Sequence, residues 1–323
     1  MEKIKMANNR IFYAVQALGI DPADSSSIVW MKGIQSVGIT TNFNLEQVFE
    51  LGQLAIYENI ENVAEIEVTV EKVLDGESLI YLTACPSGTG NIVAASNQTA
   101  GIYLAIYSDS NTSASGSSKE SVVWCSGMRP SQISYTIPVE GNATESVTFV
   151  GNDKQWGATP SSYPSFPAID GTAQTPNATV FRRRHFTKHD GSTSKIPAEV
   201  RAAVGNDKMQ SVSVSVDLGR ENIFELGSFR PYTKFTSFPV AVKADFEVIS
   251  ISGDMKTASG TGPNLETQSI KINMSNGTKT LNIDLGDKNK LTSINYTGGD
   301  TGGGNATTTY SYQGFNAFKV TLV

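Results

Sequence analysis

Two stretches of the chain carry the same pattern at an offset of 175 residues. The first is Gln35-Ser-Val-Gly-Ile-Thr-Thr-Asn-Phe-Asn-Leu-Glu-Gln-Val-Phe-Glu-Leu-Gly-Gln-Leu-Ala-Ile-Tyr57, and the second is Gln210-Ser-Val-Ser-Val-Ser-Val-Asp-Leu-Gly-Arg-Glu-Asn-Ile-Phe-Glu-Leu-Gly-Ser-Phe-Arg-Pro-Tyr232. Over these 23 positions the register holds without a gap and 9 residues are identical. Chance would give roughly one or two, and a repeat this long is a duplicated domain rather than a solenoid unit.

The match continues more weakly on the C-terminal side of each stretch. Residues 66–71 align with 242–247 after a shift of one residue, and both alternate apolar and polar side chains, the period of a half-buried strand. Ser134-Tyr135 also aligns with Ser311-Tyr312, and 147–150 with 320–323, so both copies are expected to end on the same strand. We therefore divide the chain into copy one (1–150), a Pro/Ser/Gly-rich and basic connector (151–204) and copy two (205–323).

The composition favours an all-β fold with one or two short helices, built as two tandem β-sandwich or barrel-like domains. Apolar residues make up 39% of the 323 residues and charged residues 17%, which suffices for real cores. Short helices are predicted at 77–84, after the turn at Asp75-Gly76, and at 197–204. A hairpin is predicted over 270–285 around Asn276-Gly277, and a first strand over 12–18.

Several features bear on compartment and on the membrane. No run of about 18 apolar residues occurs, so no membrane span is predicted. Residues 1–10 are charged and lack the apolar core of a signal peptide after them. Cys85 and Cys125 are the only cysteines, and we expect two free thiols.

Charge is divided unequally between the two copies. Residues 35–150 carry 13 acidic and 3 basic residues, whereas 210–323 carry 10 of each, and the connector 151–209 carries 5 and 8. Domains of one shape and different charge make complementary neighbours. Drift of a solvated surface explains the same asymmetry equally well.

No catalytic or cofactor-binding constellation is present, so the sequence predicts a protein that is not an enzyme, with no cofactor and no metal. His185 and His189 are the only histidines; their spacing could place them on one helix face, but Phe186 stands where a zinc protease has glutamate. Gly88-Thr-Gly90 lacks the Lys-Ser/Thr of a phosphate loop. Glu65, Glu67 and Glu71 share one face of one strand, which makes a wet acidic surface.

The connector contains Arg182, Arg183 and Arg184 between Phe181 and Phe186. Interleaved basic and aromatic residues can bind nucleic acid, but the chain as a whole is acidic, with a pI of about 5.1. Three arginines more often pair with carboxylates of a neighbouring subunit, so we interpret them as an inter-subunit segment.

Residues 35–53, 56–61, 66–76 and 135–154 together resemble tail tube proteins of tailed bacteriophages. The resemblance covers most of both copies and skips the connector. It implies β-sandwich or barrel-like domains that lend hairpins to a ring with a continuous β-barrel as its inner wall. Rings of such domains stack into a tube through which DNA passes from capsid to host. Single-domain members form hexamers, so a chain with two copies would complete a pseudo-sixfold ring with three subunits.

The resemblance also suggests where residues and partners belong. Glu65, Glu67 and Glu71 become candidates for a lumen-facing strand that repels DNA phosphates, matched in copy two by Lys243, Asp245 and Glu247. The fold-defining positions shared by both copies are Phe49, Gly52, Tyr57, Phe224, Gly227 and Tyr232. Expected partners are further copies of the chain, the tape measure, baseplate, terminator and sheath proteins of a tail, and DNA in transit without specific binding. The expected location is the virion tail, assembled in the host bacterial cytoplasm.

Two other functions stay open on the sequence alone. One is a baseplate hub or tail terminator built from the same domains, which would not polymerise into long tubes. The other is a secreted β-sandwich module that binds glycans, which would need a signal peptide.

Overall fold

A computed structural model describes residues 16–23, 27–52, 54, 56–86, 92–95, 97–107, 119–157, 179–204, 208–250, 265–298 and 305–323. The fold is all-β with a few short helices, as the sequence predicts. The first strand begins at Gln16, and its expected start at 12–15 lies outside the described residues. The phosphate-loop fragment at 88–90 and the connector part 158–178 also lie outside them.

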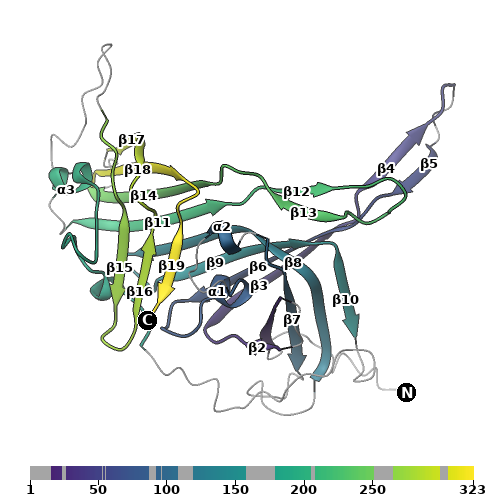
Figure 1. Cartoon of the computed structure of the whole chain (residues 1–323), viewed down its shortest axis with the longest axis horizontal. Coiled ribbons are helices and arrows are strands. Elements are labelled where there is room, and N and C mark those ends of the chain that lie inside the picture. Colours follow the sequence, from purple (N-terminus) through teal and green to yellow (C-terminus); the bar gives the residue numbers. More distant parts are fainter. Residues whose placement is uncertain are drawn as a thin grey trace, which may run out of the picture.

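The architecture centres on one long antiparallel sheet to which both copies contribute four strands (Figure 1). From copy one come β3 (Ile34–Asn42), β6 (Glu65–Val73), β9 (Thr144–Gly151) and β8 (Lys119–Pro138), in that spatial order. From copy two come β11 (Met209–Asp217), β14 (Ala241–Ile249), β18 (Thr307–Phe315) and β17 (Lys290–Thr297). We call these four-stranded groups the first unit and the second unit. They join through β8 and β11, where Ser134 lies opposite Ser215.

The two units agree in detail as well as in strand order. The register is irregular between Ile34 and Ser36 on β3 and between Met209 and Ser211 on β11, which are the same positions after the 175-residue offset. The Ser36 hydroxyl donates to Glu71 at 3.3 Å and the Ser211 hydroxyl donates to Glu247 at 2.9 Å. The duplication read from sequence is therefore visible as a duplicated hydrogen-bond pattern.

A second matching irregularity fixes the correspondence of the remaining strands. β8 and β9 lose register between Pro130 and Gln132, where the Ser131 hydroxyl donates to the Thr148 carbonyl at 3.1 Å. β17 and β18 lose register between Leu291 and Ser293, where the Thr292 hydroxyl donates to the Ser311 carbonyl at 2.9 Å. Thus β8 corresponds to β17 and β9 corresponds to β18.

This correspondence corrects the expected alignment of the C-terminal strands. Tyr135 on β8 corresponds to Tyr296 on β17, not to Tyr312, and Val147 on β9 corresponds to Tyr310 on β18. The last strand, β19 (Lys319–Leu322), pairs with β16 (Thr280–Asp284) in a separate sheet with β15 (Lys271–Ser275). The short Val-Thr-x-Val motif misled the alignment because strands of one fold share apolar-polar alternation whatever their place in the sheet.

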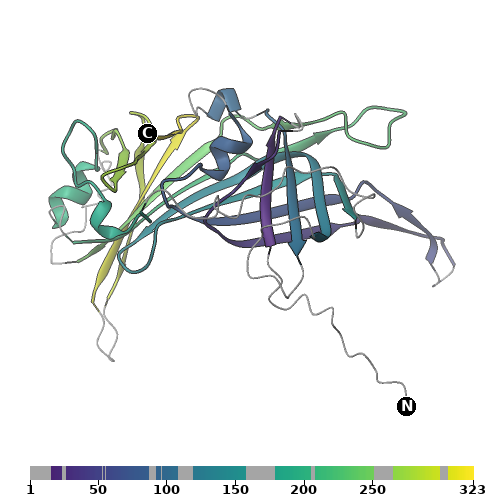
Figure 2. The ribbon, with the colours of Figure 1, turned by 90° about the horizontal axis from the view of Figure 1, so that it is seen from below.

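One face of the long sheet is apolar and forms the core. Figure 2 shows the short helices and the C-terminal strands together on one side of it. α1 (Ile80–Ala84) and α2 (Ile92–Ala95) belong to copy one, and α3 (Ala198–Val204) packs against β14. The buried side chains that this face contributes include Val68, Val70, Ile133, Tyr135, Val147, Phe149, Val212, Val214, Val216, Val242, Ala244, Phe246, Tyr310 and Tyr312.

The two predicted helices and the predicted hairpin are confirmed. α1 lies within the predicted helix at 77–84 and α3 lies within the one at 197–204. The hairpin over 270–285 forms as β15 and β16, with Gly277 at a φ of +88° and the Asn276 side chain accepting from the Thr278 and Lys279 N–H groups. Both cysteines are free and buried, as expected.

Copy one and the first residues of the connector form an additional layer of strands. The first half of β8 pairs with β7 (Ala100–Tyr107) and β10 (Asp153–Gly157), and β7 pairs with β1 (Gln16–Pro22), which pairs with β2 (Val29–Trp30). β8 can serve both layers because it is 20 residues long. The second unit has no such layer among the described residues.

Each unit extends into a projecting hairpin between its first two strands. β4 (Leu45–Phe49) and β5 (Ile56–Glu61) form the first arm, and β12 (Arg220–Ile223) and β13 (Thr233–Thr236) form the second arm. Both arms run beyond the same end of the long sheet (Figure 1). Gly52 and Gly227 take φ values of +94° and +87° at matching places, a conformation that glycine adopts without steric cost.

Candidate functional site

The second face of the long sheet is polar across both units. Residues that lie opposite each other in the register share a face, so Ser215 lies beside Ser134 on one side and Lys243 on the other. The register from β3 to β17 also places Val150, Ala241, Ile249 and Phe315 on this face. Its polar side chains include Thr40, Asn42, Glu65, Glu67, Thr69, Glu71, Thr144, Ser146, Thr148, Gln132, Ser134, Thr136, Ser211, Ser213, Ser215, Asp217, Lys243, Asp245, Glu247, Thr307, Thr309, Ser311, Gln313, Ser293, Asn295 and Thr297. All of them are partly or fully exposed.

The face is thus mainly hydroxyl and amide, with charges concentrated on β6 and β14. Glu65, Glu67 and Glu71 lie on it, opposite the buried Ile66, Val68 and Val70, so the predicted alternation is confirmed. In the second unit Lys243, Asp245 and Glu247 lie on the same face, at the places of Glu67, Thr69 and Glu71. The assignment of this face to a lumen stays a prediction.

Glu65 differs from the other two glutamates because it has an ionic partner. Its Oε1 lies 3.6 Å from Nζ of Lys234 on the second arm. Burial lowers the pKa of Lys234, and the Glu65 carboxylate opposes that shift. Arg220, at the root of the same arm, donates from Nε to the Pro130 carbonyl at 2.8 Å. Burial lowers the pKa of Arg220 to about 10, and the charge of Arg129 acts in the same direction.

Both outer edges of the long sheet are open among the described strands. β3 hydrogen-bonds to β6 alone and β17 to β18 alone. Both carry polar residues on one face, so the edges would suit another strand of the same pattern. Exposed edges of this length are sites where a further strand adds.

The duplicated positions Phe49, Gly52, Tyr57, Phe224, Gly227 and Tyr232 all lie on the arms, outside the core. Their aromatic side chains are 58–75% exposed. Leu51 and Leu226, one residue before each glycine, are fully exposed. Packing within the chain therefore does not explain why both copies keep Phe-Glu-Leu-Gly here. Repeated exposed apolar side chains are typical of an interaction surface.

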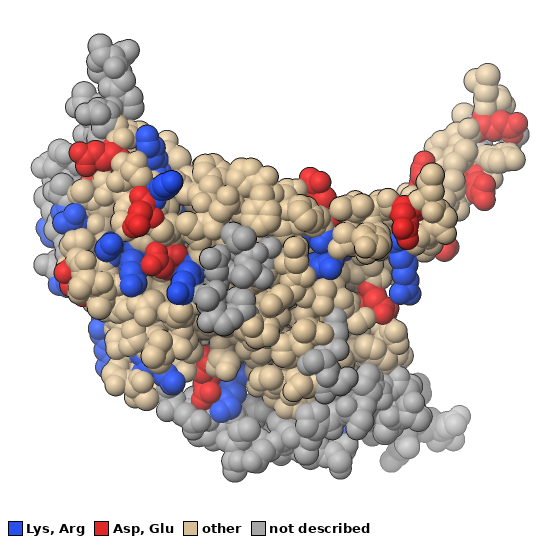
Figure 3. Space-filling view, viewed as in Figure 1, with Lys and Arg blue, Asp and Glu red and all other residues tan. Residues whose placement is uncertain are grey.

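The two arms differ in charge. Figure 3 shows acidic residues along the first arm at the right and basic residues gathered at the left of the molecule. The first arm carries Glu46, Glu50, Glu58 and Glu61, all exposed. The second arm is mixed, with two acidic residues and three basic ones: Glu221, Glu225, Arg220, Arg230 and Lys234.

The connector contacts both copies: Phe181 donates to the Leu74 carbonyl and accepts from the Ala143 N–H of copy one, whereas its later residues pack on the second copy. Thr187 N–H donates to the Asn273 carbonyl at 2.9 Å, and Lys195 pairs with Lys271 of β15. Arg182, Arg183 and Arg184 are exposed around the 3₁₀ turn Arg183–His185. Their proposed contact with another subunit stays a prediction.

The two histidines do not share a helix face, contrary to what their spacing allowed. His185 ends the 3₁₀ turn, and its Nδ1 accepts from the Arg182 N–H. The Nδ1 of His189 accepts from the Ile196 N–H at 3.0 Å. Within the described ranges, no group of three His, Cys, Asp or Glu residues could hold a metal ion.

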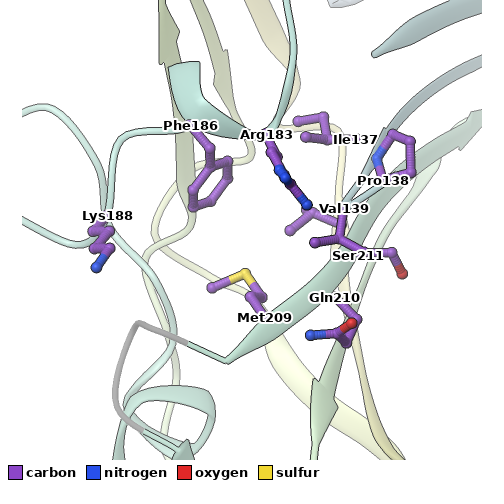
Figure 4. Close-up of a pocket in the computed structure, with 10 residues that line it drawn as sticks. Ile137, Pro138, Val139, Arg183, Phe186, Lys188, Met209, Gln210 and Ser211 are labelled. Carbon is purple, nitrogen blue, oxygen red and sulfur yellow. The ribbon is translucent and has the colours of Figure 1, made fainter. Parts of the chain in front are cut away.

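A cleft lies where the connector meets the end of the β8–β11 junction (Figure 4). Arg183 and Phe186 point into it from the connector, Met209 enters from β11, and Lys188 stands apart. Its remaining lining comes from 137–139 and 210–212. Sequence reasoning did not single out Ile137, Pro138 or Val139, because no local signal marks where β8 and β11 meet.

Comparison with known proteins adds little to this geometry. No protein-family profile matches the chain, and no curated protein does. A chain of the anti-feeding prophage baseplate, from a six-fold symmetrised cryo-EM structure, aligns with a TM-score of 0.32 and 11% identity. The alignment covers 45% of this chain and 93% of that one. A TM-score this low does not establish a shared fold. Among the described residues no helix is long and apolar enough to cross a membrane.

Proposed function

We propose that this chain is a non-catalytic structural subunit of a bacteriophage tail tube, which closes into a ring with the polar sheet face lining a channel for DNA. One observation carries the proposal. The long sheet consists of two equivalent units joined edge to edge, and its two open edges are the counterparts of the two edges already joined.

The internal junction predicts the junction between subunits. β8 pairs with β11 inside the chain; their counterparts are β17 and β3, which are the open edges. Repeating the internal register places Asn295 opposite Thr40 of the next copy, as Ser134 lies opposite Ser215. This contact joins different surfaces of two copies, and such a contact closes into a ring when its rotation permits.

The number of strands suits a wide channel. Three copies would supply six units, in agreement with a pseudo-sixfold ring, and about 24 strands. At a spacing of about 4.8 Å and a tilt of about 40°, opposite backbones lie on the order of 45 Å apart. The polar face would then meet water and DNA inside, while the apolar face stays covered by helices and the small sheet. Glutamates on β6 would repel phosphates and limit adhesion of DNA.

The arms favour a subunit that makes further contacts beyond the ring. Both project past one end of the sheet (Figure 1), and the exposures of their apolar side chains leave these free for contact. Ring-to-ring contacts of this head-to-tail type propagate into tubes. Partners among other tail proteins, and a place in the virion tail after assembly in the host cytoplasm, follow from the same proposal.

Cysteine pairing tests the ring directly. We expect Thr40→Cys with Asn295→Cys to form disulfides between chains under oxidation, ending in a closed trimer. Ser215→Cys with Ser134→Cys is the matched control and should close within one chain. Ser36→Cys with Ser293→Cys, out of register in the predicted junction, should link chains far less.

Negative-stain electron microscopy of the same samples separates the alternatives. Long tubes support the tube subunit, whereas single closed rings would favour a hub or terminator. Monomers at every concentration, with no Thr40–Asn295 link, would contradict the proposal.

A further inference from the structure

The second arm lies across the first unit of its own chain. The Arg220–Pro130 hydrogen bond of 2.8 Å and the Lys234–Glu65 ion pair of 3.6 Å hold it there. A cleft between them is lined on the arm by Asn222, Phe224, Ser228 and Phe229. On the first unit it is lined by Asn44, Asn62, Val63, Glu65 and Asn152, which we call the first seat.

The duplication places an equivalent seat on the second unit. Asn62 N–H donates to the Asn44 carbonyl at 3.3 Å, and Ser237 N–H donates to the Gly219 carbonyl at 3.1 Å, so these pairs correspond. The register of β14 with β18 makes Ala241 the counterpart of Glu65 and Phe315 the counterpart of Asn152. The second seat therefore consists of Gly219, Ser237, Phe238, Ala241 and Phe315.

The second seat is apolar and uncovered in the single chain. Phe238 is 42% exposed and Phe315 is 54% exposed. Their counterparts on the first seat are Val63 and Asn152. The Asn152 side chain is polar and donates to the Ala64 carbonyl at 2.7 Å. The second seat thus presents two partly exposed aromatic side chains at the places of Val63 and Asn152.

The first arm has matching chemistry. Where the second arm has the cations Arg220 and Lys234, the first arm has Leu45 and Asn59. Phe49, the counterpart of Phe224, is 60% exposed. The first arm therefore lacks the two cations of the second arm. The second seat likewise lacks the carboxylate of the first seat, because Ala241 stands at the place of Glu65.

We propose that the first arm of one copy docks on the second seat of a neighbouring copy, with Phe49 and Leu45 covering Phe238 and Phe315. The proposal rests on the ring proposed above. The rotation that pairs β3 with the neighbour's β17 carries the first arm along, because that arm directly follows β3. The first arm of one copy therefore reaches the second unit of the neighbouring copy. In the same way, the second arm, which directly follows β11, reaches the first unit of its own chain.

Cross-linking between chains tests the contact. A chain with Phe49→Cys is mixed with a chain with Phe315→Cys and treated with a short bis-maleimide; we expect cross-linked dimers of the two different chains. Phe224→Cys with Asn152→Cys in one chain is the matched control, because both residues line the first cleft. That control should cross-link within the chain at any protein concentration.

The Thr40–Asn295 disulfide separates the two proposals. If that disulfide forms but Phe49 and Phe315 do not cross-link, the docking is wrong and the ring stands. If neither forms while the Phe224–Asn152 control does, both proposals fail.

A charge on the seat gives an independent measurement. Phe315→Asp should raise the concentration needed for ring assembly at least about tenfold, the effect of losing roughly half the burial of one phenyl group. Asn142→Asp, which adds the same charge at an exposed position near the β8–β9 turn and outside both seats, should leave it within about twofold. Circular dichroism of both variants checks folding. Equal assembly by both folded variants would refute the docking.

Discussion

Replacing Glu145 on β9 should destabilise the protein strongly, because its side chain joins three elements. Oε2 accepts from the Ile80 N–H at 2.8 Å, and Oε1 accepts from the Tyr81 N–H at 3.1 Å and from the Tyr135 hydroxyl at 2.8 Å. Glu145 is fully buried. The side chain therefore holds the start of α1 against β8 and β9.

The magnitude follows from the donors left without a partner. A buried donor that loses its acceptor costs about 1–3 kcal/mol, so three such donors predict a loss of about 3–6 kcal/mol for Glu145→Ala, allowing for some relaxation. Glu145→Gln keeps an oxygen and the shape, so we expect about 1–3 kcal/mol. Glu140→Ala, at an exposed position near the β8–β9 turn, should change stability by less than about 0.5 kcal/mol. Urea unfolding followed by tryptophan fluorescence measures all three.

The same group predicts a dependence on pH. Burial raises the pKa of Glu145, although the hydrogen bonds from Ile80, Tyr135 and Tyr81 oppose the shift. A carboxyl whose native pKa is raised binds its proton more tightly in the folded state, so its contribution to stability is full below the unfolded pKa and is lost as pH rises through the native pKa. The free energy of unfolding of the wild type relative to Glu145→Gln should therefore decrease as pH rises above the unfolded pKa. A relative stability that increases over that interval, or a Glu145→Ala loss near zero, would refute this account.

Three further predictions concern the core. Asp75→Ala should lower the free energy of unfolding in urea by about 3–5 kcal/mol, because the Asp75 carboxylate lies 2.7 Å from the fully buried Lys72 ammonium. A loss under about 1 kcal/mol would show that the Lys32 carbonyl, which also accepts from Lys72, is a sufficient partner. Gly314→Ala should destabilise the protein by about 1–3 kcal/mol, because its new methyl group meets the hydrogen-bonded Asn289 side chain. Gly151→Ala should destabilise it less, because its methyl group meets the flexible Met128 side chain. A higher thermal midpoint for Gly314→Ala than for Gly151→Ala would contradict this order. Burial raises the pKa of Cys85 to about 12 and that of Cys125 to about 11. Both thiols should therefore react with a thiol reagent at pH 8 only when the protein unfolds. Rapid labelling of the folded chain would be inconsistent with their burial.

Local sequence patterns were sufficient for much of the fold. Alternation on 66–71 and 242–247 predicts strands with a buried and an exposed face, since side chains along a strand point alternately to its two faces. Asn276-Gly277 predicts its hairpin because glycine accepts a positive φ. The offset of 175 residues predicts the repeated unit, and the absence of charged residues at 66, 68 and 70 predicts the core face of β6.

Other features depend on contacts between residues far apart in the chain. The pairing of β8 with β11 merges both copies into one sheet, and nothing in either segment alone specifies that neighbour. The place of β18 rather than β19 beside β14 was decided by the core, because both strands carry the same alternation and only one buries Tyr310 and Tyr312 against Phe246. Likewise the repeated Phe-Glu-Leu-Gly was recognisable in the sequence, but only the tertiary structure showed that it lies exposed on two arms. An apolar residue in a strand pattern is read as core, and its exposure depends on which elements cover it.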